Sequence, residues 1–469
     1  MSKRQHPGLP AETPTAPGTQ GGSPADPLQT TPQEAPPVRL LGFWRVPFFY
    51  GWVIVVAVFV AEFVASGVGT FVTPLFFKAM TDDMGWTLTM LTGALTAQTL
   101  ANALVAPVLG KALDRLGARP VMLFGAIAAG LGLLLLTRIH AIWQFWLLYG
   151  LVGALGLAEM GGFTGPVLIT KWFTRLRGRA MAISSMGTTI GGVVMAPIVG
   201  ILIASYGWRS AWMVLGIFVL TVTIPLVLAT VRNQPEDMGL RPDGDKSGTQ
   251  RAAGSRPAKS RRYAGTDISW TVKEAMRTRT LWILIVGLNL VNLAANVTVF
   301  SLVPFLTQQE GMAVTAAGYV VSMRLGASTM SRLVWGWAVD HFPMNWCLAA
   351  GFFARALTSL CLLLPFPVNV FSVIALSVLG GGFQVLQPMA FANYFGRDHA
   401  GAIQGATRPF LIVSSLVGPL FIAFVFDVTG SFDLGFLVAG VMGLASACIG
   451  VFATAPLKKE APAAAAPLS

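Results

Sequence analysis

The sequence predicts an all-α integral membrane protein whose twelve transmembrane helices form two pseudo-symmetric six-helix bundles. Of the 469 residues, 54% are hydrophobic and 11% are charged, whereas soluble domains carry about 25% charged residues. Twelve apolar runs are each long enough to cross about 30 Å of hydrocarbon. A short Gly–Asp pattern closes the second run of each half, at 110–119 and again at 336–342. The repeat indicates that the chain is a duplicated bundle of membrane helices.

The N-terminal 47 residues precede the first apolar run. The first 40 residues contain nine prolines among Ala, Gly, Thr and Gln. This composition offers too little apolar surface to offset the entropy of ordering. We therefore expect a disordered cytoplasmic tail over 1–47. It lacks the apolar core of a signal peptide, so we expect the first span to direct insertion.

The apolar runs divide into two groups of six. We expect an N-terminal bundle over 48–231, a C-terminal bundle over 280–455 and a cytoplasmic tail over 456–469. Residues 232–279 hold eleven Lys or Arg and six acids, which predicts an interdomain loop outside the membrane. The expected spans are 48–77, 88–112, 120–138, 141–170, 177–204, 209–231, 280–308, 315–341, 346–364, 368–395, 399–427 and 432–455.

Lysines and arginines collect on one side of the predicted bundles. They gather in the loops after the second and fourth spans, in the interdomain loop and in the C-terminal tail. Because such residues stay in the cytoplasm, we expect both termini to lie inside an inner or plasma membrane. The same one-sided distribution accounts for the net charge of +12. We therefore expect the protein to be embedded in a lipid bilayer, and we do not expect it to bind nucleic acid.

The sequence shows no pattern typical of an enzyme. Cys347, Cys361 and Cys448 all fall inside apolar runs, and the four histidines lie in tails or at the ends of spans. There is no metal-ligand spacing, nucleophile elbow or phosphate-binding loop. We therefore expect no catalytic residue, no metal and no cofactor.

The loop after the second span carries spaced small and charged residues that resemble the signature loop of the major facilitator superfamily. The resemblance implies the major facilitator fold, with two halves that rock about a central site, and it implies that this loop acts as a conformational latch. In the second half Asp340 survives but His341 replaces the arginine, so we expect a weaker copy there. The matching residues of the first copy are Gly110, Asp114, Arg115, Gly117 and Arg119.

A narrower likeness covers four further segments. Residues 50–53, 171–180, 206–209 and 232–240 resemble the monocarboxylate porters and the bacterial oxalate/formate antiporters. That group moves small organic anions. The resemblance therefore implies a secondary active transporter of a mono- or dicarboxylate that works by rocker-switch alternating access as a monomeric unit. Proton symport and exchange against a counter-anion both remain open.

Two arginines lie near the midplane of the predicted second half. At about 1.5 Å per residue, Arg332 in span eight and Arg408 in span eleven fall roughly 12 to 15 Å from the cytoplasmic ends. The guanidinium fork matches a carboxylate, so both are candidate ligands of a substrate anion, with a structural ion pair as the alternative. The resemblance supports Arg332, which stands where the monocarboxylate porters keep a substrate-binding arginine. Their acidic residue one turn earlier is Ser328 here.

Two carboxylates occupy comparable depths in the first half, Glu62 in span one and Glu159 in span four. Each is a candidate proton carrier or a partner that neutralises an arginine across the interface. Arg324 and Arg355 also lie in spans, and the sequence gives them no role beyond pairing or snorkelling.

Amide side chains repeat at helical spacing on spans seven and ten. Because amides are unfavourable in lipid, we expect these faces to line a hydrated cavity, in helices that nearby glycines and prolines allow to break. Hydrogen bonding between helices is the alternative to substrate contact. The amides are Asn289, Asn292, Asn296, Gln384 and Gln387.

Two other functions fit the same fold. One is a proton-coupled exporter of drugs or other hydrophobic solutes, for which Arg332 would be dispensable. The other is a membrane nutrient sensor that binds a ligand without moving it.

Overall fold

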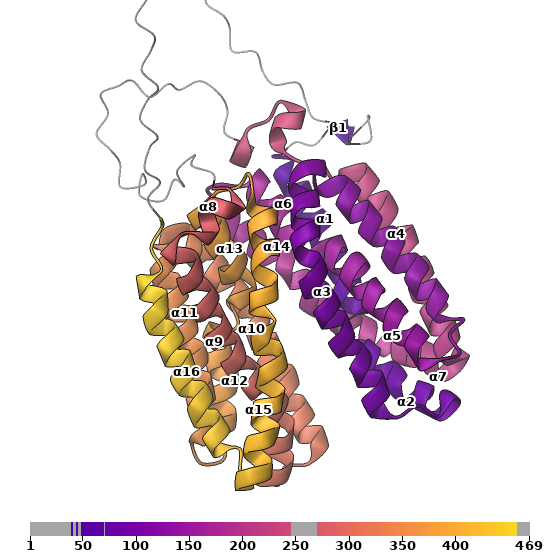
Figure 1. The fold of residues 1–469 in the computed structure, drawn as a ribbon, viewed down its shortest axis with the longest axis vertical. Helices are drawn as coiled ribbons and strands as arrows, with labels where there is room; N and C mark the ends of the chain where they lie inside the picture. The colour runs from indigo at the N-terminus through magenta and orange to yellow at the C-terminus, as the bar shows by residue number, and fades with distance from the viewer. Residues whose placement is uncertain (1–38, 41–43, 46–47, 70, 245–269, 457–469) are drawn as a thin grey trace, which may run out of the picture.

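The computed structural model describes residues 39–40, 44–45, 48–69, 71–244 and 270–456. Helices gather into two bundles (Figure 1). A small antiparallel pair, β1 (Arg39–Leu40) with β2 (Trp44–Arg45), precedes the first bundle. It lies in the predicted N-terminal tail. The expectations for the rest of that tail, for 245–269 and for 457–469 concern residues outside this description.

The N-terminal bundle contains one break and one change of helix type that the apolar pattern did not predict. The first span is divided between α1 and α2, and the fourth passes through an 11-residue π-helix, η1, which joins α5 to α6. The elements are α1 (Gly51–Val68), α2 (Thr73–Met84), α3 (Leu88–Leu116), α4 (Ala118–Leu136), α5 (Ile142–Leu151), η1 (Val152–Gly162), α6 (Thr164–Trp172) and α7 (Arg177–Thr230).

Helix α7 contains two membrane crossings. Its 54 residues would extend about 80 Å at ~1.5 Å per residue, far more than one crossing of about 30 Å requires. Gly207 interrupts it with φ 79° and ψ 164°, a conformation that only glycine adopts readily. The fifth and sixth predicted spans therefore meet at Gly207.

The C-terminal bundle follows three short helical segments. These segments are η2 (Pro235–Met238), η3 (Pro242–Gly244) and α8 (Val272–Met276). The tenth span is interrupted between Gly380 and Phe383, at the glycines that were expected to permit a break. The bundle contains α9 (Arg279–Pro304), η5 (Phe305–Gln309), α10 (Val314–His341), α11 (Met344–Leu360), η6 (Cys361–Leu363), α12 (Val368–Gly380), α13 (Phe383–Phe395), α14 (Ala400–Leu411), α15 (Val413–Thr429) and α16 (Asp433–Phe452).

The described helices account for twelve membrane crossings. Ten helices are long and apolar enough to span a bilayer, and α7 supplies two crossings. Helix α10 falls outside the ten, and it contains Arg324, Arg332 and Asp340. At 28 residues it is nevertheless long enough to cross (about 42 Å at ~1.5 Å per residue). The twelve-helix prediction is confirmed.

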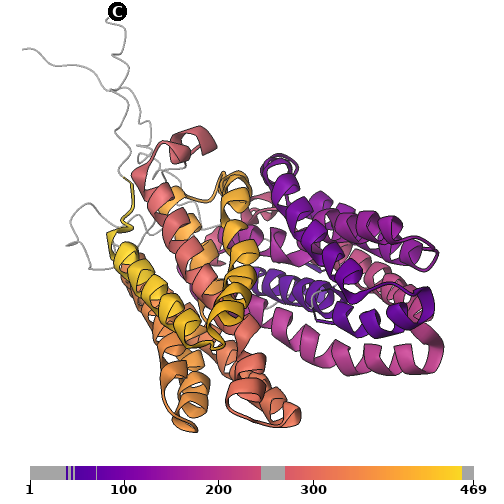
Figure 2. The same ribbon diagram turned by 60° about the horizontal axis from the view of Figure 1, so that its bottom comes forward.

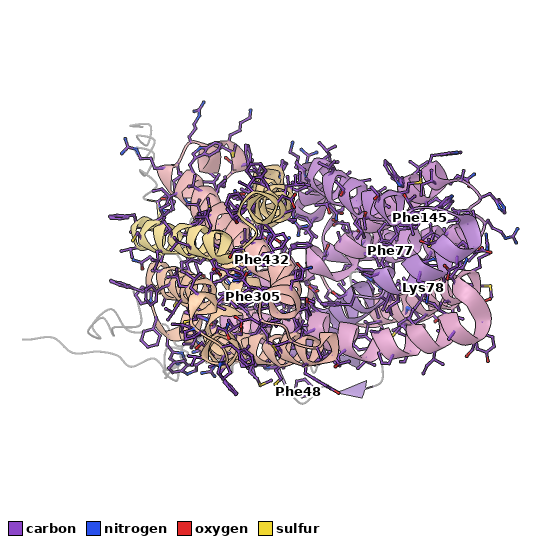
Figure 3. All side chains as sticks on the ribbon, turned by 90° about the horizontal axis from the view of Figure 1, so that it is seen from below. Phe48, Phe77, Lys78, Phe145, Phe305 and Phe432 are labelled. Carbon is purple, nitrogen blue, oxygen red and sulfur yellow. The ribbon has the colours of Figure 1, made fainter. Side chains whose placement is uncertain are left out.

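The two bundles meet at one end and diverge toward the other (Figures 1 and 2). We call the end that carries η2 and α8 the closed end, and the opposite end the open end. The open end is viewed in Figure 3, where Phe77 and Phe145 lie on the N-terminal bundle and Phe305 and Phe432 on the C-terminal one.

The buried apolar side chains follow the same division. One cluster passes through both bundles and includes Trp172 and Phe395. A second cluster, around Trp212, belongs to the N-terminal bundle alone, and a third, around Phe436, belongs to the C-terminal bundle alone. Apolar burial therefore joins the bundles at the closed end and leaves them separate at the open end.

Candidate substrate site between the bundles

Glycines bring the bundles into backbone contact at the closed end. Gly110 of α3 lies against Gly401 of α14, and Gly178 of α7 lies against Gly336 of α10. A Cβ atom on Gly110 or Gly178 would overlap the facing backbone carbonyl. The two contacts are equivalent, because each pairs the end of a second span with the start of a fifth span from the other half. Both seams therefore need glycine.

Two aspartates cap helices of the opposite bundle. The Oδ1 and Oδ2 atoms of Asp114 accept hydrogen bonds from the N–H groups of Gly401 and Ala402, at 3.1 and 2.7 Å. Asp340 does the same for α7, accepting from the N–H groups of Gly178 at 2.7 Å and Arg179 at 3.2 Å. A carboxylate at a helix N-terminus is favoured by the unpaired N–H groups and by the helix dipole.

The remaining residues of the predicted latch stay within the N-terminal bundle. Gly117 turns the chain between α3 and α4 with φ 88°, and Arg115 is exposed. The guanidinium of Arg119 donates to the carbonyl of Leu228 at 2.7 Å. Within the described part of the chain, Gly110, Asp114 and Asp340 are thus the predicted latch residues that bridge the bundles.

Glu62 lies where α1 crosses its neighbours and is 8% exposed. The hydroxyl of Thr188 on α7 donates to its Oε2 at 2.9 Å. Gly161, Gly165 and Gly187 pack around it, so the backbones of η1, α6 and α7 approach α1 closely. The carboxylate is therefore held by one hydroxyl and by small neighbours, and no described residue forms an ion pair with it.

Glu159 lies in the π-helix η1 and is 2% exposed. The hydroxyl of Thr164 donates to its Oε2 at 3.4 Å, and its nearest cationic influence is Arg408 from the other bundle. π-Helical turns are uncommon and often occur at functional sites. Here the wider turn carries one of the two carboxylates of the N-terminal bundle interior.

Arg332 reaches across the interface from α10 and is 6% exposed. Its Nη1 donates to the backbone carbonyl of Ser185 on α7, and its Nε is buried without an acceptor among the described residues. Its charge acts on Glu62. In this conformation Arg332 connects the two bundles.

The guanidinium of Arg408, on α14, forms no hydrogen bond or ion pair with any described residue. Its Cζ lies 4.8 Å from the centroid of the Phe163 ring, a cation–π contact from one bundle to the other. Both Glu62 and Glu159 interact with its charge through space. The five N–H donors of this guanidinium are therefore available to a ligand.

A pocket of about 250 Å³ opens between these residues. It brings together three of the predicted site residues: Glu62 from α1, and Gln384 and Arg408 from the C-terminal bundle. Ser184, Ser185 and Thr188 complete the N-terminal wall with Ser66 and with apolar or small residues. The lining residues are Glu62, Ser66, Ala158, Gly162, Pro166, Met181, Ser184, Ser185, Thr188, Gln384 and Arg408.

The other predicted amides lie outside the pocket wall. The Nδ2 atoms of Asn289 and Asn296 donate to carbonyls one turn earlier on α9, at 2.9 Å each. Asn292 and Gln387 are half-buried and make no side-chain hydrogen bond within the described chain. Arg332 and Glu159 border the pocket region without lining it.

Several residues at the interface carried no prediction. The hydroxyls at 184, 185 and 188 fall on adjacent faces of one span, and this spacing in an otherwise apolar run was the available signal. At the closed end, Arg397 donates to Glu236 of η2 at 2.9 Å, and Arg177 donates to Asn393 at 3.2 Å. This ion pair and this hydrogen bond join segments distant in sequence, so no local pattern indicates them.

The described residues contain no cluster of three or more His, Cys, Asp or Glu side chains able to hold a metal ion. The polar groups of the pocket are carboxylate, guanidinium, hydroxyl and amide. This set is suited to binding a small polar or charged solute by hydrogen bonds.

Comparison with known proteins agrees with the fold. The chain is similar to human monocarboxylate transporter 11, with 26% identity over 451 residues that cover 89% of this chain and 84% of the relative. It is also similar to the membrane sensor protein UhpC of Salmonella typhimurium, with 28% identity over 71% of this chain and 76% of the relative.

Among solved structures, the fucose:proton symporter FucP of E. coli is similar with a TM-score of 0.64 and 13% identity, covering 86% of this chain and 98% of that one. The family model described as Major Facilitator Superfamily matches residues 58–408 and 284–468. The chain forms two six-helix bundles with a pocket between them, and it matches this family model over most of its length. These findings lead to one conclusion. The chain is a multi-pass membrane protein that belongs to the Major Facilitator Superfamily, a superfamily of small-molecule transporters rather than of enzymes.

Proposed function

We propose that the protein carries a small organic anion, a mono- or dicarboxylate, by rocker-switch alternating access. The observation that supports this most is Arg408, whose guanidinium lines the pocket and has no hydrogen-bond acceptor among the described residues. A guanidinium fork binds a carboxylate through two parallel hydrogen bonds. The pocket of about 250 Å³ is smaller than the roughly 300–1,000 Å³ of drug-sized sites, which favours a short acid over a drug.

Glu62 supplies the proton-dependent part of the proposal. It lines the same pocket as Arg408, so a substrate carboxylate and an ionised Glu62 would repel each other at close range. Binding of the anion and binding of a proton to Glu62 therefore favour each other. This coupling supports proton symport, and exchange of two anions is the alternative that the first experiment separates.

The closed end is assigned to the cytoplasm. The loops after the second and fourth spans, with their Lys and Arg, lie at this end with η2 and α8, as the positive-inside rule requires of cytoplasmic loops. The conformation described is then closed inward and opens outward. Rocking would separate the glycine seams and release Asp114 and Asp340 from the helix ends that they cap.

The test uses purified full-length protein in liposomes and a panel of labelled lactate, pyruvate, oxalate, formate and longer acids. An imposed inward proton gradient should drive accumulation of at least one short acid, and Arg408→Gln should lose it. Transport of neutral solutes with no competition by any acid would contradict the proposal. Exchange of anions without a response to the proton gradient would select the exchange mechanism.

The similarity to UhpC supports one second candidate, a membrane sensor that binds its ligand without net flux. The same liposomes decide between the two. A sensor would bind a labelled acid, seen as retention by the protein, while the liposome interior gains none.

A further inference from the structure

A second pair of arginines lies inside the C-terminal bundle, away from the substrate pocket. Arg324 of α10 and Arg355 of α11 are half-buried, and neither lines the pocket. Neither forms a hydrogen bond or ion pair with a described residue, and the Nε of Arg324 is buried without an acceptor. The two guanidiniums are also close enough to repel each other.

Arg355 borders the helix break of the tenth span. A Cβ atom on Gly380, the last residue of α12, would lie 3.5 Å from the Cα of Arg355. The Cζ of Arg355 lies 5.4 Å from the centroid of the Phe383 ring, and Phe383 is the first residue of α13. The guanidinium therefore lies beside the start of α13.

The face of α10 that carries Arg324 reaches the same break. Ser328 follows Arg324 by one helical turn, so both side chains share a face. Gly381, in the middle of the break, packs directly against Ser328 and has no room for a Cβ atom. Ser328 thus packs directly against the break, on the face of α10 that carries Arg324.

The start of α13 adds a third source of positive potential. Gly382 occupies the N-cap position, and no side chain caps this 13-residue helix. The first N–H groups of a helix lack partners within it, and the helix dipole places partial positive charge there. A helix start beside two cations without partners is an anion-binding arrangement.

No acidic side chain among the described residues forms an ion pair with either arginine. Between residues 311 and 397 Asp340 is the only acidic residue, and it caps α7 at the closed end. A cation in the membrane interior costs several kcal/mol unless it is paired or hydrated. Two neighbouring cations without a carboxylate therefore favour a bound anion.

We propose that Arg324, Arg355, Ser328 and the start of α13 bind a small inorganic anion of the halide class, which stays in place as the substrate passes. A halide suits this arrangement because a monatomic anion accepts hydrogen bonds from any direction, so guanidinium and backbone N–H donors from different helices can converge on it. The site is separate from the pocket that contains Arg408, so this proposal does not depend on the nature of the transported solute.

The first test measures thermal unfolding of the purified full-length protein as sodium gluconate is replaced by sodium chloride or sodium bromide at constant ionic strength. Chloride and bromide should raise the Tm of the wild type in a saturable manner. Arg355→Gln should lose this shift, and in gluconate it should unfold at a higher temperature than the wild type because a buried cation without a partner has been removed. Arg408→Gln, which alters only the substrate pocket, should keep the shift.

Three results would overturn the proposal. These are equal Tm values in chloride and gluconate for the wild type, a halide shift that survives in Arg355→Gln, and a shift that disappears in Arg408→Gln. An oxalate or formate shift that requires Arg355 and exceeds the chloride shift would assign the site to a carboxylate instead. Arg324→Gln replaces Arg355→Gln if the latter does not fold.

The second test needs no variant. Crystals of the wild-type protein grown or soaked in sodium bromide should give an anomalous peak between α10, α11 and the first turn of α13. A peak confined to the pocket beside Arg408, or no ordered bromide inside the C-terminal bundle, would overturn the assignment. These outcomes are independent of the liposome assay, so failure of either proposal can be recognised without the other.

Discussion

The two bundles share a helix plan but carry opposite charges in their interiors. In the N-terminal bundle the mid-membrane charges are the carboxylates Glu62 and Glu159, both nearly fully buried. In the C-terminal bundle they are four guanidiniums. Duplication thus kept the closed-end contacts, where Asp114 and Asp340 make equivalent hydrogen bonds, while the middle of each half diverged. The four guanidiniums belong to Arg324, Arg332, Arg355 and Arg408.

The difference separates what the fold requires from what the solute requires. Small residues and helix caps serve the rocking motion and are needed twice, once on each side of the interface. Positive and negative side chains around the single pocket serve recognition of the solute, so each half needs to supply only one sign of charge. We therefore expect substitutions at the closed end to change rates in a symmetric way and substitutions in the middle to have effects specific to one half.

The largest expected effect comes from the cationic side of the pocket. Arg408→Gln should lower substrate affinity by roughly ten- to hundred-fold, because hydrogen bonds to a charged group are worth about 1.5–3 kcal/mol. Arg332→Lys, at the edge of the pocket, should also lose most transport, because an ammonium cannot reproduce the directed guanidinium contact with the Ser185 carbonyl across the interface. Initial uptake rates in liposomes measure both. Arg138→Gln, at an exposed position, is the matched control, and wild-type uptake by Arg408→Gln would remove this residue from the site.

The next largest effect is expected from the two buried carboxylates, Glu62 and Glu159. Glu62→Gln mimics a permanently protonated carboxyl, so it should abolish accumulation driven by a proton gradient and spare exchange between identical anions. Glu159→Gln tests the other carboxylate in the same way. Paired measurements of gradient-driven uptake and of exchange in the same liposomes distinguish the outcomes. Full gradient-driven uptake by both variants would exclude these acids as the proton carriers.

A smaller effect is expected at the glycine seams. Gly110→Leu and Gly178→Leu should each destabilise the closed end by about 1–3 kcal/mol, because the added side chain meets the facing backbone. Transport should fall in both variants, and cysteines placed at the closed end should become more reactive toward a soluble thiol reagent. Gly200→Leu, on α7, is the control, because an added Cβ atom there meets open space. If transport fell in only one of the two seam variants, the two glycine contacts would not be equivalent.

The smallest effect separates the two helix caps. Asp114→Asn and Asp340→Asn keep an acceptor oxygen but lose the charge, which at a helix N-terminus contributes about 0.3–1 kcal/mol. Each should change turnover by roughly two- to fivefold and leave substrate affinity nearly unchanged. The loop pattern predicts a weaker second copy, whereas two hydrogen bonds at each aspartate favour equal effects. Parallel measurements of kcat and KM for the two variants decide which is right.

Much of the fold could be predicted from the sequence. Apolar runs identify membrane helices because the bilayer requires about 20 apolar residues per crossing, and the Gly–Asp repeat revealed the two halves. Glycines before Gln384 permitted a break in the tenth span, but the sequence did not show that one occurs there. The π-helix around Glu159 was not predicted, since a change of helix type hardly alters the apolar pattern of a span.

The candidate site was predicted less completely, for a geometric reason. Counting residues from a span end gives depth along the helix axis, but the direction of a side chain around that axis depends on packing. Glu62 and Arg408 share the pocket wall, whereas Arg332, at a similar depth, bonds to the carbonyl of Ser185 beside it. The hydroxyls of Ser184 and Thr188 were missed because such groups also occur as ordinary packing residues in membrane helices.

The exchange of helix caps has a consequence for the role of water. At the closed end four backbone amides, those of Gly178, Arg179, Gly401 and Ala402, donate to carboxylates of the opposite bundle. None of them has an intrahelical acceptor, so separation of the bundles must hydrate all four amides and both carboxylates. Osmolytes, which are excluded from protein surfaces, oppose such hydration. Osmotic stress should thus hold the transporter in the conformation described here. The change of transport rate with osmolyte concentration would give the number of water molecules that enter as the closed end opens.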